Sequence, residues 1–214
     1  MQEDYERENV DIIDKILMRP KSYAVIGLVL INVWVFLMVE ITGSSMDSQH
    51  MLQWGAAEPV LIQSGEFYRL FTSMFLHFGL EHLLCNMVLL FFAGDSLERA
   101  EGKLRFLLVY LGGGLIGNLA SFLWDSKKGE NIISAGASGA VFAIIGALIF
   151  LVLYNKGRFE AKSLKRLLLM AILTIVYGMS ETNIDNAAHI GGLIGGFFIA
   201  LLVCRKTPAT HELF

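Results

Sequence analysis

Charged residues are scarce in this sequence. Aspartate, glutamate, lysine and arginine together make up 17% of its 214 residues, whereas soluble proteins carry about 25%. Hydrophobic residues make up 55%, so we expect a membrane protein that crosses the bilayer several times. The net charge is only -3, and the basic residues cluster beside apolar segments. We therefore expect no nucleic-acid partner.

Cysteine is also scarce. Cys85 and Cys204 both lie inside apolar runs, with no CxxC motif and no Cys/His pairing. This pattern argues against a disulfide framework and a zinc site, and we expect neither a metal nor a cofactor. Residues 1–22 lack the basic start and short apolar core of a signal peptide. We expect them to form a retained cytoplasmic segment.

Apolar runs long enough to cross a membrane, which takes about 20 residues, recur along the chain. We expect six transmembrane helices, over residues 23–42, 79–97, 104–124, 133–154, 167–179 and 187–204. The fifth is short, and flanking basic side chains that snorkel would lengthen it. Residues 43–73 are semi-polar and predict short interfacial helices. The expected domains are thus a six-helix unit over 23–204 and a cytoplasmic tail over 205–214.

Alternate connections between these runs carry almost no positive charge. The N-terminal segment, the second and fourth connections and the tail hold 14 of the 17 lysines and arginines. Cytoplasmic loops are enriched in these residues, so we expect a multi-pass protein of the cell membrane with both termini in the cytoplasm. The second, fourth and sixth helices would then all begin at the outer face.

Each of these three helices carries unusual polar residues in its first turns. A serine hydroxyl is a poor nucleophile unless a base takes its proton, and we predict Ser138 as nucleophile and His189 as base. Small residues beside both predict that their helices pack closely. The alternative is that Gly-Ala-Ser-Gly is a packing motif and His189 a hydrogen-bonded structural residue.

His82 and Asn86 share one helical face at i and i+4. Together with the Ser138 amide near a helix N-terminus, they are candidate oxyanion donors. The alternative is a polar pair that joins helices. His77 lies about 140° from His82 on an ideal helix, so we expect it to face elsewhere, in a structural or rim role.

Two further residues lie close to the candidate pair in sequence. Phe142, one turn after Ser138, is expected either to stack on the His189 imidazole or to pack against core or lipid. Asp185 lies four residues before His189, where an aspartate is more often the N-cap of its helix. We therefore expect a Ser-His dyad and not a triad, and leave open whether Asp185 assists His189.

Several motifs occur in a fixed order between residues 54 and 196. They are Trp54-Gly55-Ala56, Gly65-Glu66-Phe67-Tyr68-Arg69-Leu70, Phe75-Leu76-His77-Phe78-Gly79 with His82 and Asn86, Gly94-Asp95-Ser96-Leu97-Glu98 with Gly102, Gly136-Ala137-Ser138-Gly139, and Ala188-His189 with Gly191 and Gly195. This ordered set closely resembles the rhomboid family of intramembrane serine proteases. Six spans without a seventh resemble its compact bacterial form.

The resemblance implies an all-α membrane protein of six transmembrane helices with a large membrane-embedded first loop. By similarity Ser138 and His189 are catalytic, His82, Asn86 and the Ser138 amide are oxyanion donors, Gly136 and Phe142 support the site, and Glu98 and Arg99 stabilise the fold. The chain departs from the family at Tyr68, where Trp is usual, and at Phe142, where Tyr is frequent. Phenylalanine preserves stacking but lacks the phenol.

The implied activity is that of a serine endopeptidase that cleaves single-span membrane proteins near the outer end of their helix. Its partners would be transmembrane substrates and the lipid bilayer; other partners, such as membrane proteases or chaperones, are left open. Rival functions are a small polytopic transporter, in which intramembrane His and Asn residues bind a ligand or relay protons, and an inactive rhomboid relative that binds membrane proteins.

Overall fold

The computed structural model of the chain describes residues 22–154, 169 and 185–204. Five long helices dominate this part of the chain: α2 (Tyr23–Thr42), α6 (Gly79–Glu101), α7 (Lys103–Lys128), α8 (Ser138–Tyr154) and α10 (Asn186–Val203). All except α8, which has 17 residues, are long and apolar enough to cross a membrane. The fifth expected span, residues 167–179, lies outside the described residues apart from Leu169.

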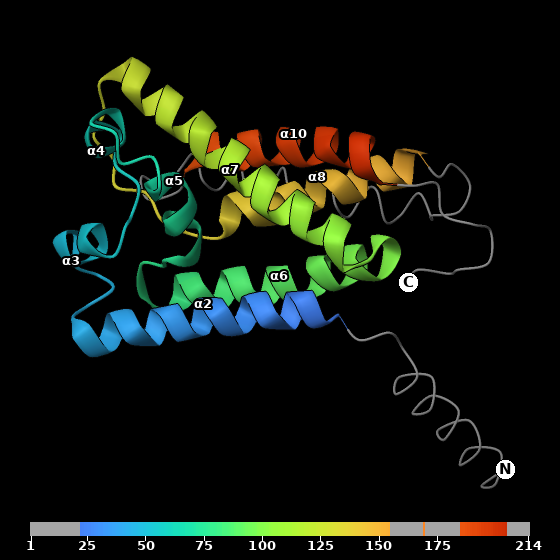
Figure 1. Cartoon of the computed structure of the whole chain (residues 1–214), viewed down its shortest axis with the longest axis horizontal. Coiled ribbons are helices and arrows are strands. Elements are labelled where there is room, and N and C mark those ends of the chain that lie inside the picture. The colour runs from blue at the N-terminus through green and yellow to red at the C-terminus, as the bar shows by residue number, and fades with distance from the viewer. Residues whose placement is uncertain (1–21, 155–168, 170–184, 205–214) are drawn as a thin grey trace, which may run out of the picture.

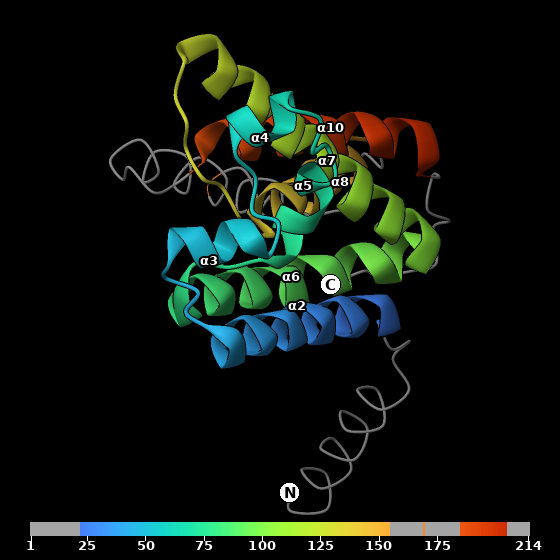
Figure 2. The same cartoon turned by 60° about the vertical axis from the view of Figure 1, so that its left-hand side comes forward.

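The α8 helix is the centre of the bundle. It is apolar all round and is buried from Gly139 to Val152, as expected for a helix enclosed by others. Helices α7 and α10 pack on it and on each other, α6 also contacts it, and α2 lies along α6 (Figures 1 and 2). Large apolar side chains on the outer helices are exposed, including Trp34, Phe92 and Leu202. Lipid would cover these side chains in a bilayer.

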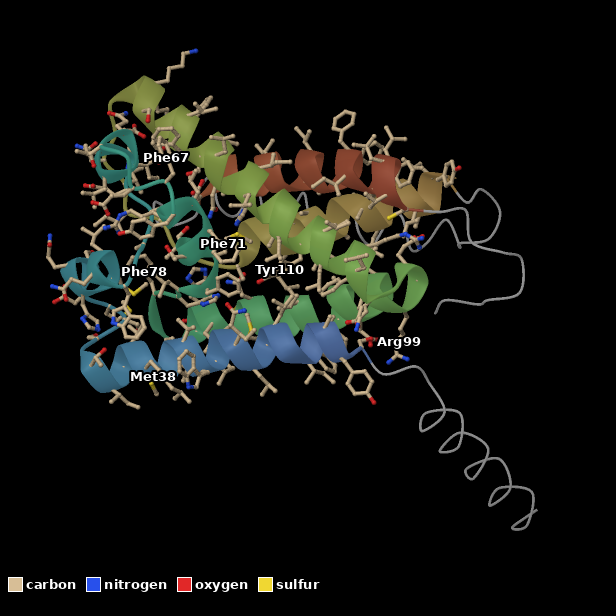
Figure 3. The ribbon with its side chains drawn as sticks, in the orientation of Figure 1. Met38, Phe67, Phe71, Phe78, Arg99 and Tyr110 are labelled. Atoms are coloured by element: carbon tan, nitrogen blue, oxygen red, sulfur yellow. The ribbon has the colours of Figure 1, made fainter. Side chains whose placement is uncertain are left out.

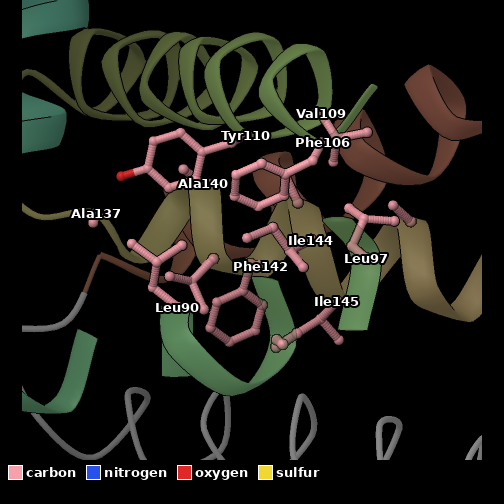
Figure 4. Close-up of a cluster of buried hydrophobic side chains, with 14 of the residues drawn as sticks. Leu90, Leu97, Phe106, Val109, Tyr110, Ala137, Ala140, Phe142, Ile144 and Ile145 are labelled. Carbon is pink, nitrogen blue, oxygen red and sulfur yellow. The ribbon is translucent and has the colours of Figure 1, made fainter. Parts of the chain in front are cut away.

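One continuous apolar cluster joins α6, α7 and α8 (Figure 4). Its largest fully buried members include Leu90 and Leu97 of α6, Phe106 and Tyr110 of α7, and Phe142, Ile144 and Ile145 of α8. This cluster fixes the first turns of α8 against α6, so the helix that begins with Ser138 has a defined position relative to the helix that carries His82.

The expected start of the fourth span at Ile133 is wrong, because α8 begins at Ser138. Before it the chain is extended, and Ser134 pairs with Ala57 in an antiparallel bridge through two backbone hydrogen bonds of 2.8 and 2.9 Å. Gly136 has a φ of 148°, which is not helical, and its N–H donates to the Ser73 carbonyl. Hydropathy alone cannot predict the bridge between Ser134 and Ala57, because these residues are far apart in the sequence.

The connection between α2 and α6 contains α3 (Ser48–Gln53), α4 (Pro59–Gln63), α5 (Arg69–Thr72) and a 3-10 helix, η1 (Ser73–Phe75). The short helices expected here are therefore present. They gather at the end of the bundle where α2 ends and α6 begins (Figure 1), with Phe67 and Phe71 among their side chains (Figure 3). Arg69 holds this first loop together: it is buried and donates to the carbonyls of Leu52 and Ala56 and to the Glu66 carboxylate.

At the opposite end, α6 caps α2. The Glu98 carboxylate accepts hydrogen bonds from the Ala24 and Val25 amides at 3.1 and 2.8 Å. These amides belong to the first turn of α2, which has no intrahelical acceptors for them. Arg99, labelled in Figure 3, pairs with Asp95, which also accepts from Ser22. The stabilising role that the resemblance implied for Glu98 and Arg99 thus has a geometric basis.

Candidate active site

The candidate site forms where α6, α8 and α10 begin, beside the first loop. Ser138 is the first residue of α8, so its amide lies among the unpaired N–H groups of the helix N-terminus. The positive end of the helix dipole is directed to the same place. The arrangement therefore favours negative charge close to the Ser138 hydroxyl.

Close contact between the backbones of α8 and α10 brings His189 to this end of α8. A Cβ atom added at Gly192 would collide with the Gly139 carbonyl oxygen, and one added at Gly196 would collide with the Ala143 carbonyl oxygen. No larger residue fits at either glycine without separating the helices. The small-residue faces expected on both helices therefore do meet.

The imidazole of His189 stacks on the ring of Phe142. The two ring centroids are 4.3 Å apart and the planes differ by 9°; both residues are buried. Because Phe142 follows Ser138 by four residues, the two share one face of α8, and the stacked imidazole lies on that face. Phe142 therefore stacks on His189 and also packs in the apolar core, so the two expected settings are both found.

No hydrogen bond joins Ser138 to His189 within the described part of the chain, and the buried Nδ1 of His189 has no partner there. Hydrogen bonds between catalytic groups are often long before substrate binds. Packing, and not a third side chain at Nδ1, thus sets the orientation of this imidazole.

His82 reaches the segment that precedes Ser138. A Cβ atom on Gly136 would lie 2.9 Å from two atoms of the His82 ring and 3.8 Å from the Ser138 Oγ. Only glycine permits both this contact and the positive φ. Asn86 is buried, and its side-chain amide donates to the His82 carbonyl at 3.0 Å. One of its two N–H groups is therefore used within α6.

The expectation that His77 faces away from His82 is wrong. His77 precedes α6, so helical geometry does not apply to it, and its ring meets that of His82 edge to face at 5.2 Å. Its Nε2 accepts a hydrogen bond from the Ala137 amide at 3.3 Å. Burial lowers the pKa of His77 to about 3, which keeps the ring neutral and able to accept.

Asp185 is the N-cap of α10, as its position suggested. Its carboxylate accepts a hydrogen bond from the Ala188 amide and further bonds from the hydroxyls of Ser121 and Ser134. Sequence reasoning missed Ser121, although a polar residue near the end of an apolar run is a signal in itself. Across the described ranges no group of three histidine, cysteine or acidic side chains is arranged to hold a metal ion.

Comparison with known proteins fits this geometry. A model of the rhomboid domain matches residues 64–206, which is more than half of the chain. The chain belongs to the rhomboid family. It is therefore a helical membrane protein, as the resemblance implied.

Among the curated rhomboid relatives, GluP of Bacillus subtilis (strain 168), named a rhomboid protease, is 40% identical over 170 residues. That match covers 79% of this chain but only 32% of GluP. AarA of Providencia stuartii, also named a rhomboid protease, is 34% identical over 197 residues, covering 81% of this chain and 70% of AarA. The chain thus spans about a third of one relative and most of the other.

The contact between Gly136 and His82 generates a prediction for Gly136→Ala. The added methyl group displaces the His82 ring, so labelling of Ser138 by a fluorophosphonate should slow at least about tenfold, because one lost oxyanion donor costs about 100- to 1000-fold. Gly65→Ala is the control: its φ is 110°, but nothing lies within 4 Å of the added Cβ. Both variants carry the backbone strain, about 1 to 2 kcal/mol. Equal labelling rates in the two would contradict a role for the contact.

Proposed function

We propose that this rhomboid chain is an intramembrane serine endopeptidase with a Ser138-His189 dyad. The observation that carries the proposal is the stacking of His189 on Phe142, one turn from Ser138 on the same face of α8. A base held there lies on the face of α8 that carries the Ser138 hydroxyl. The names of GluP and AarA as rhomboid proteases agree with it.

The proposed reaction proceeds in two steps. Ser138 Oγ attacks the carbonyl carbon of the substrate peptide while His189 Nε2 accepts its proton. The C–N bond then breaks, and His189 gives that proton to the leaving amine. In the second step His189 takes a proton from water, the hydroxide attacks the Ser138 ester, and that proton passes to Ser138 as the carboxylic acid product leaves and then ionises in water.

Developing negative charge on the carbonyl oxygen requires donors. The Ser138 amide at the start of α8 is one, and the helix dipole acts in the same direction. His82 is a second, supported by its contact with the Gly136 segment. Asn86 is a third through its remaining N–H, since the other donates within α6.

The proposed substrates are single-span membrane proteins cut near the outer end of their helix. A helix hides its carbonyls in hydrogen bonds, so cleavage requires local unwinding, which weak helix formers make easier. The site lies where three apolar helices begin, beside the polar first loop. This location suits a segment that unwinds at the membrane surface, where water can enter.

The dyad is tested by Ser138→Ala and His189→Ala, each of which should reduce cleavage of a single-span model substrate at least about 1000-fold, as loss of a nucleophile or its base does in serine proteases. Ser96→Ala is the control, because among the described residues this hydroxyl bonds only to the Phe92 carbonyl of its own helix. Substantial cleavage by folded Ser138→Ala would exclude the serine mechanism. Wild-type protein that binds the substrate without cleaving it would favour the inactive relative.

We also propose that both termini are cytoplasmic, because 14 of the 17 lysines and arginines fall on that side. The exposed residues Lys103 and Glu130 lie at opposite ends of α7. In a background without Cys85 and Cys204, Glu130→Cys should react with a membrane-impermeant thiol reagent on intact cells. Lys103→Cys should react only after permeabilisation. The reverse pattern would contradict the proposed orientation.

A further inference from the structure

We infer that Asp185 is a positioning residue that fixes His189 relative to Ser138 without touching either side chain. The inference rests on the proposed function. It concerns the hydrogen bonds by which one carboxylate joins α10, α7 and the extended segment that precedes the nucleophile.

The Asp185 carboxylate binds three separate parts of the chain. Oδ1 accepts from the Ala188 amide at 2.8 Å, which caps α10. Oδ2 accepts from Ser134 Oγ at 2.8 Å and from Ser121 Oγ on α7. Ser121 is 64 residues and Ser134 is 51 residues from Asp185 in sequence. These contacts are therefore tertiary and go well beyond an ordinary cap, which serves its own helix alone.

Both members of the dyad lie four residues along the chain from a residue of this hydrogen-bond network, His189 from Asp185 and Ser138 from Ser134. His189 donates its backbone N–H to the Asp185 carbonyl at 3.1 Å, and Ser138 follows Ser134 by four residues. Ser134 is also held by its bridge to Ala57. A shift of the Asp185 side chain would therefore change the start of α10 relative to the segment that leads into α8, and with it the separation of base and nucleophile.

No described side chain makes a hydrogen bond to the buried Nδ1 of the His189 ring, so none of them orients it in the manner of a triad aspartate. Phe142 restrains the plane of the ring by stacking, but stacking permits sliding in that plane. The position of the α10 backbone at His189 sets the remaining freedom. Besides the contacts of α10 with α8, Asp185 ties the start of that backbone to Ser134, in the segment that precedes Ser138.

A carboxylate suits the binding of one amide and two hydroxyls better than an amide side chain does. It offers acceptor oxygens on both sides, and hydrogen bonds to charged acceptors are roughly twice as strong as neutral ones. Asparagine is as good an N-cap as aspartate, but with its oxygen on Ala188 it turns an NH2 group toward the two hydroxyls. Those hydroxyls can rotate to accept, so Asp185→Asn should keep the cap and weaken the tertiary bonds.

Asp125 offers a matched control. It lines the same cavity as Ser121 and Ser134 and is buried. Its carboxylate accepts no hydrogen bond from another described residue. Asp125→Asn therefore makes the same chemical change in the same cavity and removes none of the three hydrogen bonds that the Asp185 carboxylate accepts.

The experiment measures kcat and KM for a single-span model substrate, and the rate of fluorophosphonate labelling of Ser138, at a temperature where each variant is folded. For Asp185→Ala we expect kcat and the labelling rate to fall about 10- to 100-fold, as small misplacements of catalytic groups do, with KM changed less than about twofold. Asp185→Asn and the double variant Ser121→Ala/Ser134→Ala should show smaller falls in the same quantities. Asp125→Asn should resemble the wild type.

Wild-type kcat and labelling rates in both Asp185→Asn and the serine double variant would overturn the inference. So would an equal loss in Asp125→Asn, or a change in melting temperature and KM alone, which is the signature of a structural cap. If Asp185→Ala does not fold, Asp185→Asn and the serine double variant test the inference in its place. Failure of the proposed function can be told apart from failure of this inference. If the proposed function is wrong, Ser138→Ala cleaves the substrate at the wild-type rate, whatever the Asp185 variants do.

Discussion

The site depends on the direct contact between the backbones of α8 and α10. In lipid there is little hydrophobic drive to bring helices together, so close approach relies on small residues and van der Waals packing. Gly139 meets Gly192 and Ala143 meets Gly196 with no room for a side chain. This spacing permits the Phe142 and His189 rings to stack face to face at 4.3 Å. A helix pair separated by larger side chains could not bring these two rings together.

Polar groups near the apolar bundle are tolerated because the first loop and the segment before α8 form hydrogen bonds with each other. Arg69 binds the carbonyls of Leu52 and Ala56, and the next residue, Ala57, pairs with Ser134. Ser134 in turn donates to Asp185. A chain of hydrogen bonds therefore runs from the first loop to the start of α10. It passes through Ser134, which lies four residues before Ser138 in the sequence.

The apolar runs predicted most of the fold. The bounds expected for α2 are those found, and α6, α7 and α10 differ by only a few residues at their ends. The start of α8 was wrong by five residues, because Ile133 to Ala137 are apolar enough for a helix, while the bridge at Ser134 and the positive φ of Gly136 prevent one. His77 was misplaced for a related reason, since a helical angle was applied to a residue outside the helix.

In the site, the sequence indicated which residues are polar at unusual depth, but not which of them touch. Periodicity placed Phe142 and Ser138 on one face, yet only the packing of α10 decides that Phe142 meets an imidazole. The bonds from Ser121 and Ser134 to Asp185 span more than fifty residues, and no local pattern encodes such pairing.

The central claim is that Ser138 is the activated hydroxyl of this chain. It is tested most directly by treating the folded, detergent-solubilised protein with a fluorophosphonate at neutral pH and locating the adduct by peptide mass spectrometry. The account predicts one phosphonyl group, on the peptide that contains Ser138 and at that residue, and none in protein carrying His189→Ala. An adduct at another serine, or none in folded wild-type protein, would contradict it.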